Sequence, residues 1–266
     1  MNLPVAVDRQ VRHLLNKLTT ENFESTSDQI IEWANKSEHE KDGKTLIRVI
    51  QLVYDKAMDD PGWSDMYARL CRKMMEQISN KVQDDGVKDS LGNPLTGGQL
   101  FRKHLLNRCR EDFEGSWADS KPSIAVTTTT KTGEDHVGNA NTTSQERGDE
   151  TGEIEPYFQE SYAIQRAKRK GVALVKFLGE LFKLRMLGER IMHECVKKLL
   201  GNAYTPKEEE TDAMRESFKV VGKVLDTSMA HAHMDVYFRR MRELAGVSSL
   251  SPRAQSQLQV CGTIIL

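Results

Sequence analysis

The sequence has few cysteines and aromatic residues, no signal-peptide pattern and no long hydrophobic run. Its cysteines lie far apart in the chain, at Cys71, Cys109, Cys195 and Cys261. This spacing argues against a CxxC metal site and a disulfide framework, and it favours reduced thiols in a cytosolic or nuclear protein. The first residues, MNLPVAVDRQ, lack the basic start and apolar stretch of a signal peptide. No apolar run approaches the roughly 18 residues of a membrane span, so we expect no membrane association.

Motifs of the common catalytic and metal sites are absent as well. The sequence contains no GxxxxGK[ST], GxGxxG, GxSxG or HExxH pattern. Two histidine-containing pairs, His193 with Cys195 and His231 with His233, have a spacing of two, which places their side chains on opposite sides of a helix. We therefore expect a protein that is not an enzyme and that binds no metal and no cofactor.

What the sequence has in abundance is helical periodicity. Leu, Lys, Glu, Arg and Met are frequent, and apolar stripes such as Leu46, Ile50, Val53 and Ala57 recur. The stripes form four units of two helices each, at 20–58, 63–114, 163–200 and 207–245. Units of this length are typical of HEAT-type solenoids, in which each pair buries its apolar face against its neighbours. The prediction is an all-α solenoid of about four antiparallel pairs, and a compact helical bundle is the alternative.

One segment interrupts this pattern and divides the chain. Residues 116–155 carry eight acidic and three basic side chains, with runs of threonine and few apolar residues. Such a composition cannot bury enough apolar surface to offset the entropy of ordering, which predicts a disordered loop. We therefore expect helical repeats over 1–114, a disordered acidic loop over 115–153, further repeats of the same solenoid over 154–246, and an irregular tail over 247–266.

Three stretches combine an apolar stripe with a specific pattern of charge. They are VRHLLNKLTTENF (11–23), FRKHLLNRCREDFE (101–114) and VKFLGELFKLRML…IMHECVKKLL (175–200). In their order and spacing they resemble the middle domain of eukaryotic translation initiation factor four-gamma, the scaffold of the cap-binding complex. The segment from Arg166 to Leu200 is most similar to the fungal form. Related helical domains occur in nuclear cap-binding, decay and splicing factors, which the LNKLT and FRKxLLNRC forms fit less well.

The resemblance implies a HEAT-repeat crescent that acts in the cytoplasm in translation initiation. It implies binding of the DEAD-box RNA helicase of the complex through the first helical pairs, and contact with mRNA. The positions that match the helicase grip are Leu14, Leu15, Asn16, Lys17, Leu18 and Phe23, whose apolar face would insert against the partner. Without the family, the same leucines would be interpreted as covering the first helical pair. The alternative function is an RNA-binding module of a decay or nuclear cap-binding factor that does not engage this helicase.

A second candidate surface is basic, although the whole chain has a net charge of only −1. Residues 166–185 contain seven basic side chains and one acidic side chain. A basic helix face can neutralise RNA phosphates without reading sequence, although an ordinary solvated face has the same pattern. The candidate RNA-binding residues on this segment and on the preceding helix are Arg102, Lys103, Arg108, Arg166, Lys168, Arg169, Lys170 and Lys176.

The chain departs from the family pattern in two places. After Gly246 the family has a fifth helical pair, whereas VSSLSPRAQSQLQVCGTIIL offers a Ser-Pro helix breaker and a short apolar end. We therefore expect the last pair to be missing and an apolar face of the preceding pair to be exposed, which favours self-association. None of the tyrosines has a leucine five residues later, so the motif that captures the cap-binding subunit is absent. This suggests a fragment of a larger factor or a short form.

Overall fold

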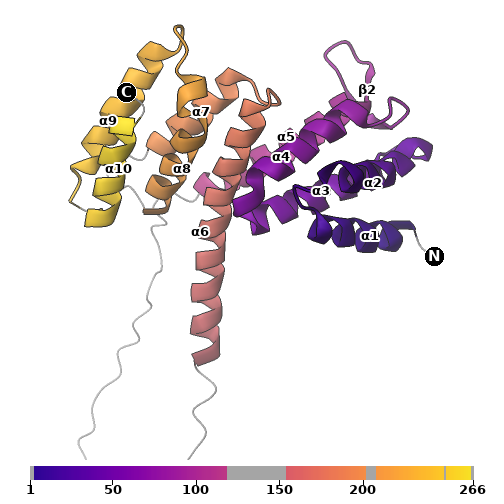
Figure 1. Cartoon of the computed structure of the whole chain (residues 1–266), viewed down its shortest axis with the longest axis horizontal. Helices are drawn as coiled ribbons and strands as arrows, with labels where there is room; N and C mark the ends of the chain where they lie inside the picture. Colours follow the sequence, from indigo (N-terminus) through magenta and orange to yellow (C-terminus); the bar gives the residue numbers. More distant parts are fainter. Residues whose placement is uncertain (1–2, 119–153, 202–207, 249, 265–266) are drawn as a thin grey trace, which may run out of the picture.

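The computed structural model describes residues 3–118, 154–201, 208–248 and 250–264, with side chains for 5–115, 169–201, 211–248 and 250–260. The described residues form ten α-helices, two 3-10 turns and one hairpin (Figure 1). In chain order they are α1 (Leu3–Lys17), α2 (Phe23–Asn35), η1 (Lys36–His39), α3 (Lys44–Asp59), η2 (Pro61–Trp63), α4 (Ser64–Gln77), β1 (Gln83–Lys88), β2 (Pro94–Thr96), α5 (Gly97–Ala118), α6 (Ile154–Lys183), α7 (Glu189–Leu200), α8 (Glu208–Leu225), α9 (His231–Ala245) and α10 (Pro252–Ile264).

The helices form two layers that follow the chain. In the first layer α1 packs on α3 and α3 on α5, and α7 packs on α9. In the second layer α2, α4, α6, α8 and α10 pack on one another in that order. Each element lies against near neighbours in the series, as expected for stacked helical pairs. The predicted all-α solenoid is confirmed, with α1 and α10 added at its two ends.

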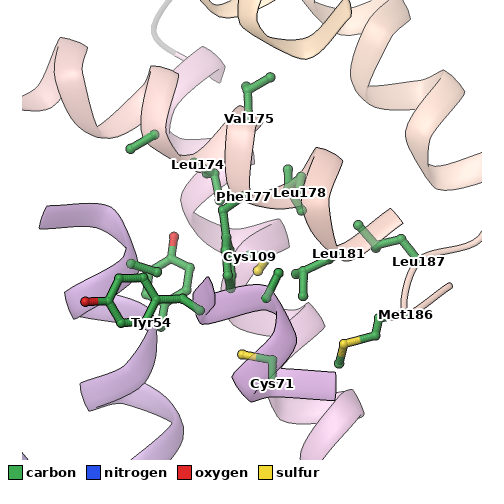
Figure 2. Packing of buried hydrophobic residues seen from close by; sticks show 14 of the residues in the cluster. Tyr54, Cys71, Cys109, Leu174, Val175, Phe177, Leu178, Leu181, Met186 and Leu187 are labelled. Carbon is green, nitrogen blue, oxygen red and sulfur yellow. The ribbon is translucent and has the colours of Figure 1, made fainter. Parts of the chain in front are cut away.

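Helix α6 joins the two halves of the molecule. It stands between α1–α5 on one side and α7–α10 on the other (Figure 1), and it packs against α3, α4, α5, α7 and α8. Its apolar side forms the core shown in Figure 2, where the Phe177 ring meets Tyr54 edge-on at 6.3 Å between centroids. The contact with α8 is close, since a Cβ on Gly179 would lie 2.9 Å from Val220.

A short antiparallel hairpin, β1 and β2, joins α4 to α5 within the unit predicted at 63–114, where the sequence indicated no strands. Its turn is closed by Asp89, whose carboxylate accepts hydrogen bonds from the backbone N–H of Leu91 at 2.8 Å and of Asn93 at 2.9 Å. The strands are too short and too polar to produce an alternating apolar pattern. Of the predicted acidic loop 115–153, residues 115–118 belong to α5, and the rest lies outside the described residues.

The prediction of an irregular tail over 247–266 is wrong for residues 252–264, which form α10. Ser251 and Pro252 begin α10 instead of ending a helix, because proline is well suited to the first helical position, where no backbone N–H is needed. The Ser251 hydroxyl accepts a hydrogen bond from the backbone N–H of Ala254 at 3.3 Å. Leu250, Ala254 and Leu258 are buried, and α10 packs on α8 and α9. An exposed apolar face was expected at this end of the solenoid, but α10 packs on it.

Candidate partner and RNA interfaces

Helix α1 ends the first layer and is fixed to the rest of the chain by its apolar stripe. Val7, Val11 and Leu15 are buried against α2 and α3. The Asp8 carboxylate binds the Arg48 guanidinium of α3 through two nitrogen atoms. This hydrogen bonding holds the pKa of Asp8 below its usual range, although burial acts in the opposite direction.

The residues predicted to grip the helicase divide into two groups. Leu15, Leu18 and Phe23 are only 3%, 6% and 4% exposed, so the expectation that they present an apolar face to a partner is wrong. Leu14 is half-buried, whereas Asn16 and Lys17 are exposed. The reason is that α1 has α2 and α3 to pack on, and an apolar stripe looks the same whether it is buried within its own chain or against another.

Phe23 has a structural role at the junction of α2 and α4. The Arg69 guanidinium lies 4.5 Å from the centre of its ring. Beside it, the Lys73 ammonium forms ion pairs with Glu24 at 2.6 Å and Asp28 at 2.7 Å. Phe23 is thus covered by cations of its own chain and is closed to a partner.

The accessible side of α1 is the one that faces away from α2 and α3. We call it the α1 outer face, and its exposed residues are Val5, Arg9, Arg12, His13, Asn16 and Lys17. It is mostly basic and polar, with Val5 as an apolar residue that is 65% exposed. Asn16 and Lys17 of this face were predicted, but Val5, Arg9, Arg12 and His13 were missed, because the periodic pattern marks only the buried stripe. The sequence signal that could have indicated this face was Val5, an apolar residue that does not belong to the buried stripe.

Six of the eight predicted RNA-binding residues have described side chains, and four of these six are engaged within the protein. Arg102 donates to the Met186 carbonyl at 2.9 Å, and Lys176 donates to the Pro61 carbonyl at 2.8 Å. The Arg108 guanidinium and the Lys170 ammonium both face Asp112, at 3.7 Å and 2.7 Å. These cations hold α5 and α6 in place, so only part of their charge is directed to solvent.

Asp112 is the centre of a polar junction between α3, α5 and α6. It also accepts a hydrogen bond from the Tyr54 hydroxyl at 2.9 Å. Burial raises the pKa of this carboxyl, but the hydrogen bonds from Lys170 and Tyr54 outweigh burial and hold the pKa below its usual range. Asp112 therefore stays ionised and keeps Lys170 against the junction.

The two remaining candidates with described side chains do not lie in one patch. Lys103 and Arg169 are both exposed, but they line different cavities. Arg169 lies beside Lys176 at a cavity of about 650 Å³ near η2, whereas Lys103 faces α7. Arg166 and Lys168 belong to α6, and their side chains lie outside the described residues.

The cysteines and histidines discounted as metal ligands have ordinary surroundings. His193 is buried, and its Nδ1 lies 2.9 Å from the Tyr237 hydroxyl of α9. Burial raises the pKa of the Cys195 thiol to about 11, so this thiol is neutral at physiological pH. Within the described ranges, no three His, Cys, Asp or Glu side chains are grouped as metal ligands. Among the same residues, we find no helix with the length and apolarity that crossing a bilayer requires.

Comparison with known proteins gives consistent matches over almost the whole chain. The family model of the MIF4G domain matches residues 8–264, from α1 into α10. The eukaryotic translation initiation factor 4 gamma of Schizosaccharomyces pombe is 44% identical over 256 residues, which are 96% of this chain and 16% of that protein. Eukaryotic translation initiation factor 4 gamma 3 of Homo sapiens is 35% identical over 94% of this chain and 14% of its own length. The chain thus spans less than a fifth of these relatives.

A solved structure has the same fold. It is the MIF4G domain of the Trypanosoma cruzi translation initiation factor EIF4G5, which aligns with a TM-score of 0.50 at 15% identity and covers 98% of this chain and 95% of that one. At this identity the likeness concerns the fold. It extends to both ends of the solenoid and includes the region of α10.

Proposed function

The chain belongs to the MIF4G domain family, and from this membership we propose that it is a scaffold module of translation initiation. The module binds the DEAD-box RNA helicase of the cap-binding complex and contacts mRNA without sequence specificity. The observation that carries the proposal is the 44% identity with a fission-yeast initiation factor over 96% of the chain. The alternative, a decay or nuclear cap-binding module, has less support, because the relatives reported above are initiation factors.

A scaffold of this kind needs no catalytic group of its own. A helicase of two lobes is active when the lobes are arranged to bind ATP and RNA together. A rigid helical crescent that contacts both lobes favours that arrangement if it binds it more tightly than the open one. The continuous core from α3 through α6 to α8 provides the stiffness that such a role requires.

We place the helicase contact on the α1 outer face. This face lies at the end of the solenoid (Figure 1), and it includes Asn16 and Lys17 from the positions that match the family's grip. Val5 supplies an apolar contact, and Arg9 and Lys17 supply charge. Exposed apolar and charged side chains occur together in protein interfaces.

The variant Val5→Glu/Lys17→Glu tests this placement. Because both side chains are exposed, the fold is expected to remain intact, while affinity for the helicase falls at least about tenfold, or roughly 1.4 kcal/mol. Stimulation of the helicase ATPase should fall with it. Binding is measured by calorimetry and by pull-down with and without RNase.

The matched control is Met229→Glu/Lys88→Glu, which makes the same changes of charge and apolarity on the α8–α9 loop and the hairpin. If the two variants had equal affinities for the helicase, the contact would not lie on α1. Capture of the helicase that disappears with RNase would favour the alternative function, because RNA would then be bridging the two proteins.

We place the mRNA contact on the middle of α6. Arg169 is exposed there, and the Lys170 side chain keeps 43% of its surface exposed while it pairs with Asp112. In a plot of log affinity against log salt concentration, each phosphate contact with a single strand makes the slope steeper by about 0.7. The triple variant Arg166→Gln/Lys168→Gln/Arg169→Gln should therefore flatten the slope by roughly 2 for oligouridine.

The control for RNA binding is Lys41→Gln/Lys81→Gln/Lys88→Gln, which removes the same charge near the hairpin. It should leave the slope unchanged if the contact is on α6. An affinity that is the same at low and physiological salt, or an equal effect of both triple variants, would contradict the placement. Fluorescence anisotropy over a salt series provides the measurement.

A further inference from the structure

A groove runs between α5 and α7 that neither the helicase nor the mRNA proposal uses. Two cavities of about 560 and 620 Å³ form it, and they share Arg110, Phe113, Ile191 and Cys195. One wall is α5 from Gln99 to Glu114, and the other is α7 with the turn before it, from Leu187 to Gly201. Because α6 packs against both α5 and α7, its Leu178 contributes to the floor. We call this surface the α5–α7 groove.

The floor of the groove is apolar, and part of it is exposed. It is lined by Leu106, Phe113, Leu178, Leu187 and Ile191. Leu106 is half-buried, and Ile191 is 46% exposed although it belongs to a helix with a well-formed apolar stripe of its own. Exposed apolar surface with a polar border is characteristic of a binding site.

The border of the groove is cationic. Lys103 and Arg110 stand on the α5 side, and Arg190, Lys197 and Lys198 stand on the α7 side. Glu114 and Glu194 are the acidic residues that line it, and they face Arg110 at 4.0 Å and Lys197 at 3.3 Å. The cations are in excess, so the groove favours a ligand with acidic flanks.

Both walls have the length of a helix of about four turns. The α5 wall has about 16 residues and the α7 wall about 15, which correspond to roughly 22–24 Å at 1.5 Å per residue. RNA fits the charge but not the floor, because bases stack on exposed aromatic rings and Phe113 is only 5% exposed. A second copy of this chain, placed groove against groove, would set two cationic borders against each other, and they would repel.

From this combination we propose that the α5–α7 groove binds an acidic amphipathic α-helix of a partner protein. The helix lies along α5, its apolar stripe contacts Leu106 and Ile191, and its Asp or Glu side chains pair with Arg190 and Lys198 on the border. This is the helix-in-groove mode of peptide recognition. The site is separate from the α1 outer face, so it adds a partner to the proposed function and does not depend on the helicase.

The probe is a fluorescein-labelled 16-residue peptide with leucines at i, i+3, i+4 and i+7 and glutamates on both flanks. Fluorescence anisotropy with the full chain should show saturable binding. In Ile191→Glu the affinity should fall at least about tenfold, as for the loss of a central apolar contact. The matched control is Val236→Glu, a change to glutamate at a 53% exposed position on α9, which should leave the affinity within twofold.

The charge of the border is tested separately. Arg190→Glu/Lys198→Glu should weaken the acidic peptide at least about tenfold, and a peptide with lysines in place of the glutamates should bind the wild type that much more weakly. In ¹⁵N-labelled protein, the shifts caused by the peptide should cluster on α5 and α7. The proposal would be overturned if the acidic peptide did not bind, or if the lysine peptide bound the wild type equally well. It would also be overturned if Ile191→Glu and Val236→Glu bound the acidic peptide with equal affinity, or if oligouridine displaced the peptide.

Discussion

The variant Leu15→Ala/Leu18→Ala is expected to lose at least about 4 kcal/mol of unfolding free energy, since a buried Leu→Ala change costs roughly 2–5 kcal/mol. Both side chains lie in the core that joins α1 to α2 and α3. A domain's total stability is about 5–15 kcal/mol, so a large share would be lost. Because repeats depend on their neighbours, melting should begin at α1 and show as an early step in circular dichroism.

The exposed neighbours supply the control for this prediction. Asn16→Ala/Lys17→Ala changes the same turn of α1 at two exposed positions and should stay within about 0.5 kcal/mol of the wild type. If the leucine variant unfolded like the wild type, α1 would not be packed on α2 and α3 in solution.

This expectation changes how loss of helicase binding is to be interpreted. A leucine variant that fails to bind has lost the surface on which the contact stands, so the loss would not locate the contact. The surface variant Val5→Glu/Lys17→Glu separates the two causes, because it alters what a partner meets and leaves the core intact.

The helical pairs were predictable because each helix buries one stripe on a surface of its own chain. The unit predicted at 63–114 corresponds to α4 and α5, and the unit at 163–200 corresponds to α6 and α7. Helix α10 was missed because Ser251-Pro252 was interpreted as a break, although the same dipeptide can begin a helix. The hairpin was missed because a strand pair this short is formed by turn chemistry around Asp89.

The candidate sites were less predictable than the fold. A stripe of leucines indicates a buried face, but its partner is decided by tertiary packing, and here Leu15 and Leu18 are covered by the chain itself. Charge along α6 indicated a basic face, yet Lys170 and Lys176 bind Asp112 and the Pro61 carbonyl. These partners are distant in sequence, as are the α5 and α7 residues that form the groove, so no local pattern reveals them.

Replacing Gly98 by alanine is the other change with a large expected effect. A Cβ there would lie 1.8 Å from the Met75 carbonyl oxygen and 2.9 Å from the carbonyl carbon. Both atoms belong to the backbone of α4, so no rotation of a side chain relieves the overlap. Overpacking costs about 1–3 kcal/mol and sometimes more, and we expect at least about 3 kcal/mol here because a helix must move. Urea unfolding followed by circular dichroism measures the loss.

Gly115→Ala is the matched control, because it makes the same substitution in the same helix where nothing lies within 4 Å of the new Cβ. Alanine is favoured over glycine inside a helix by about 1 kcal/mol, so this variant should be neutral or more stable. Effects of opposite sign would show that Gly98 sets the distance between α4 and α5. Equal small effects would mean that the two helices stand further apart, and Leu100 and Phe101 would then lack the close contact that buries them.

The spacing of this second pair also positions Leu106 and Arg110 on the groove, so peptide binding should fail together with stability in Gly98→Ala and persist in Gly115→Ala.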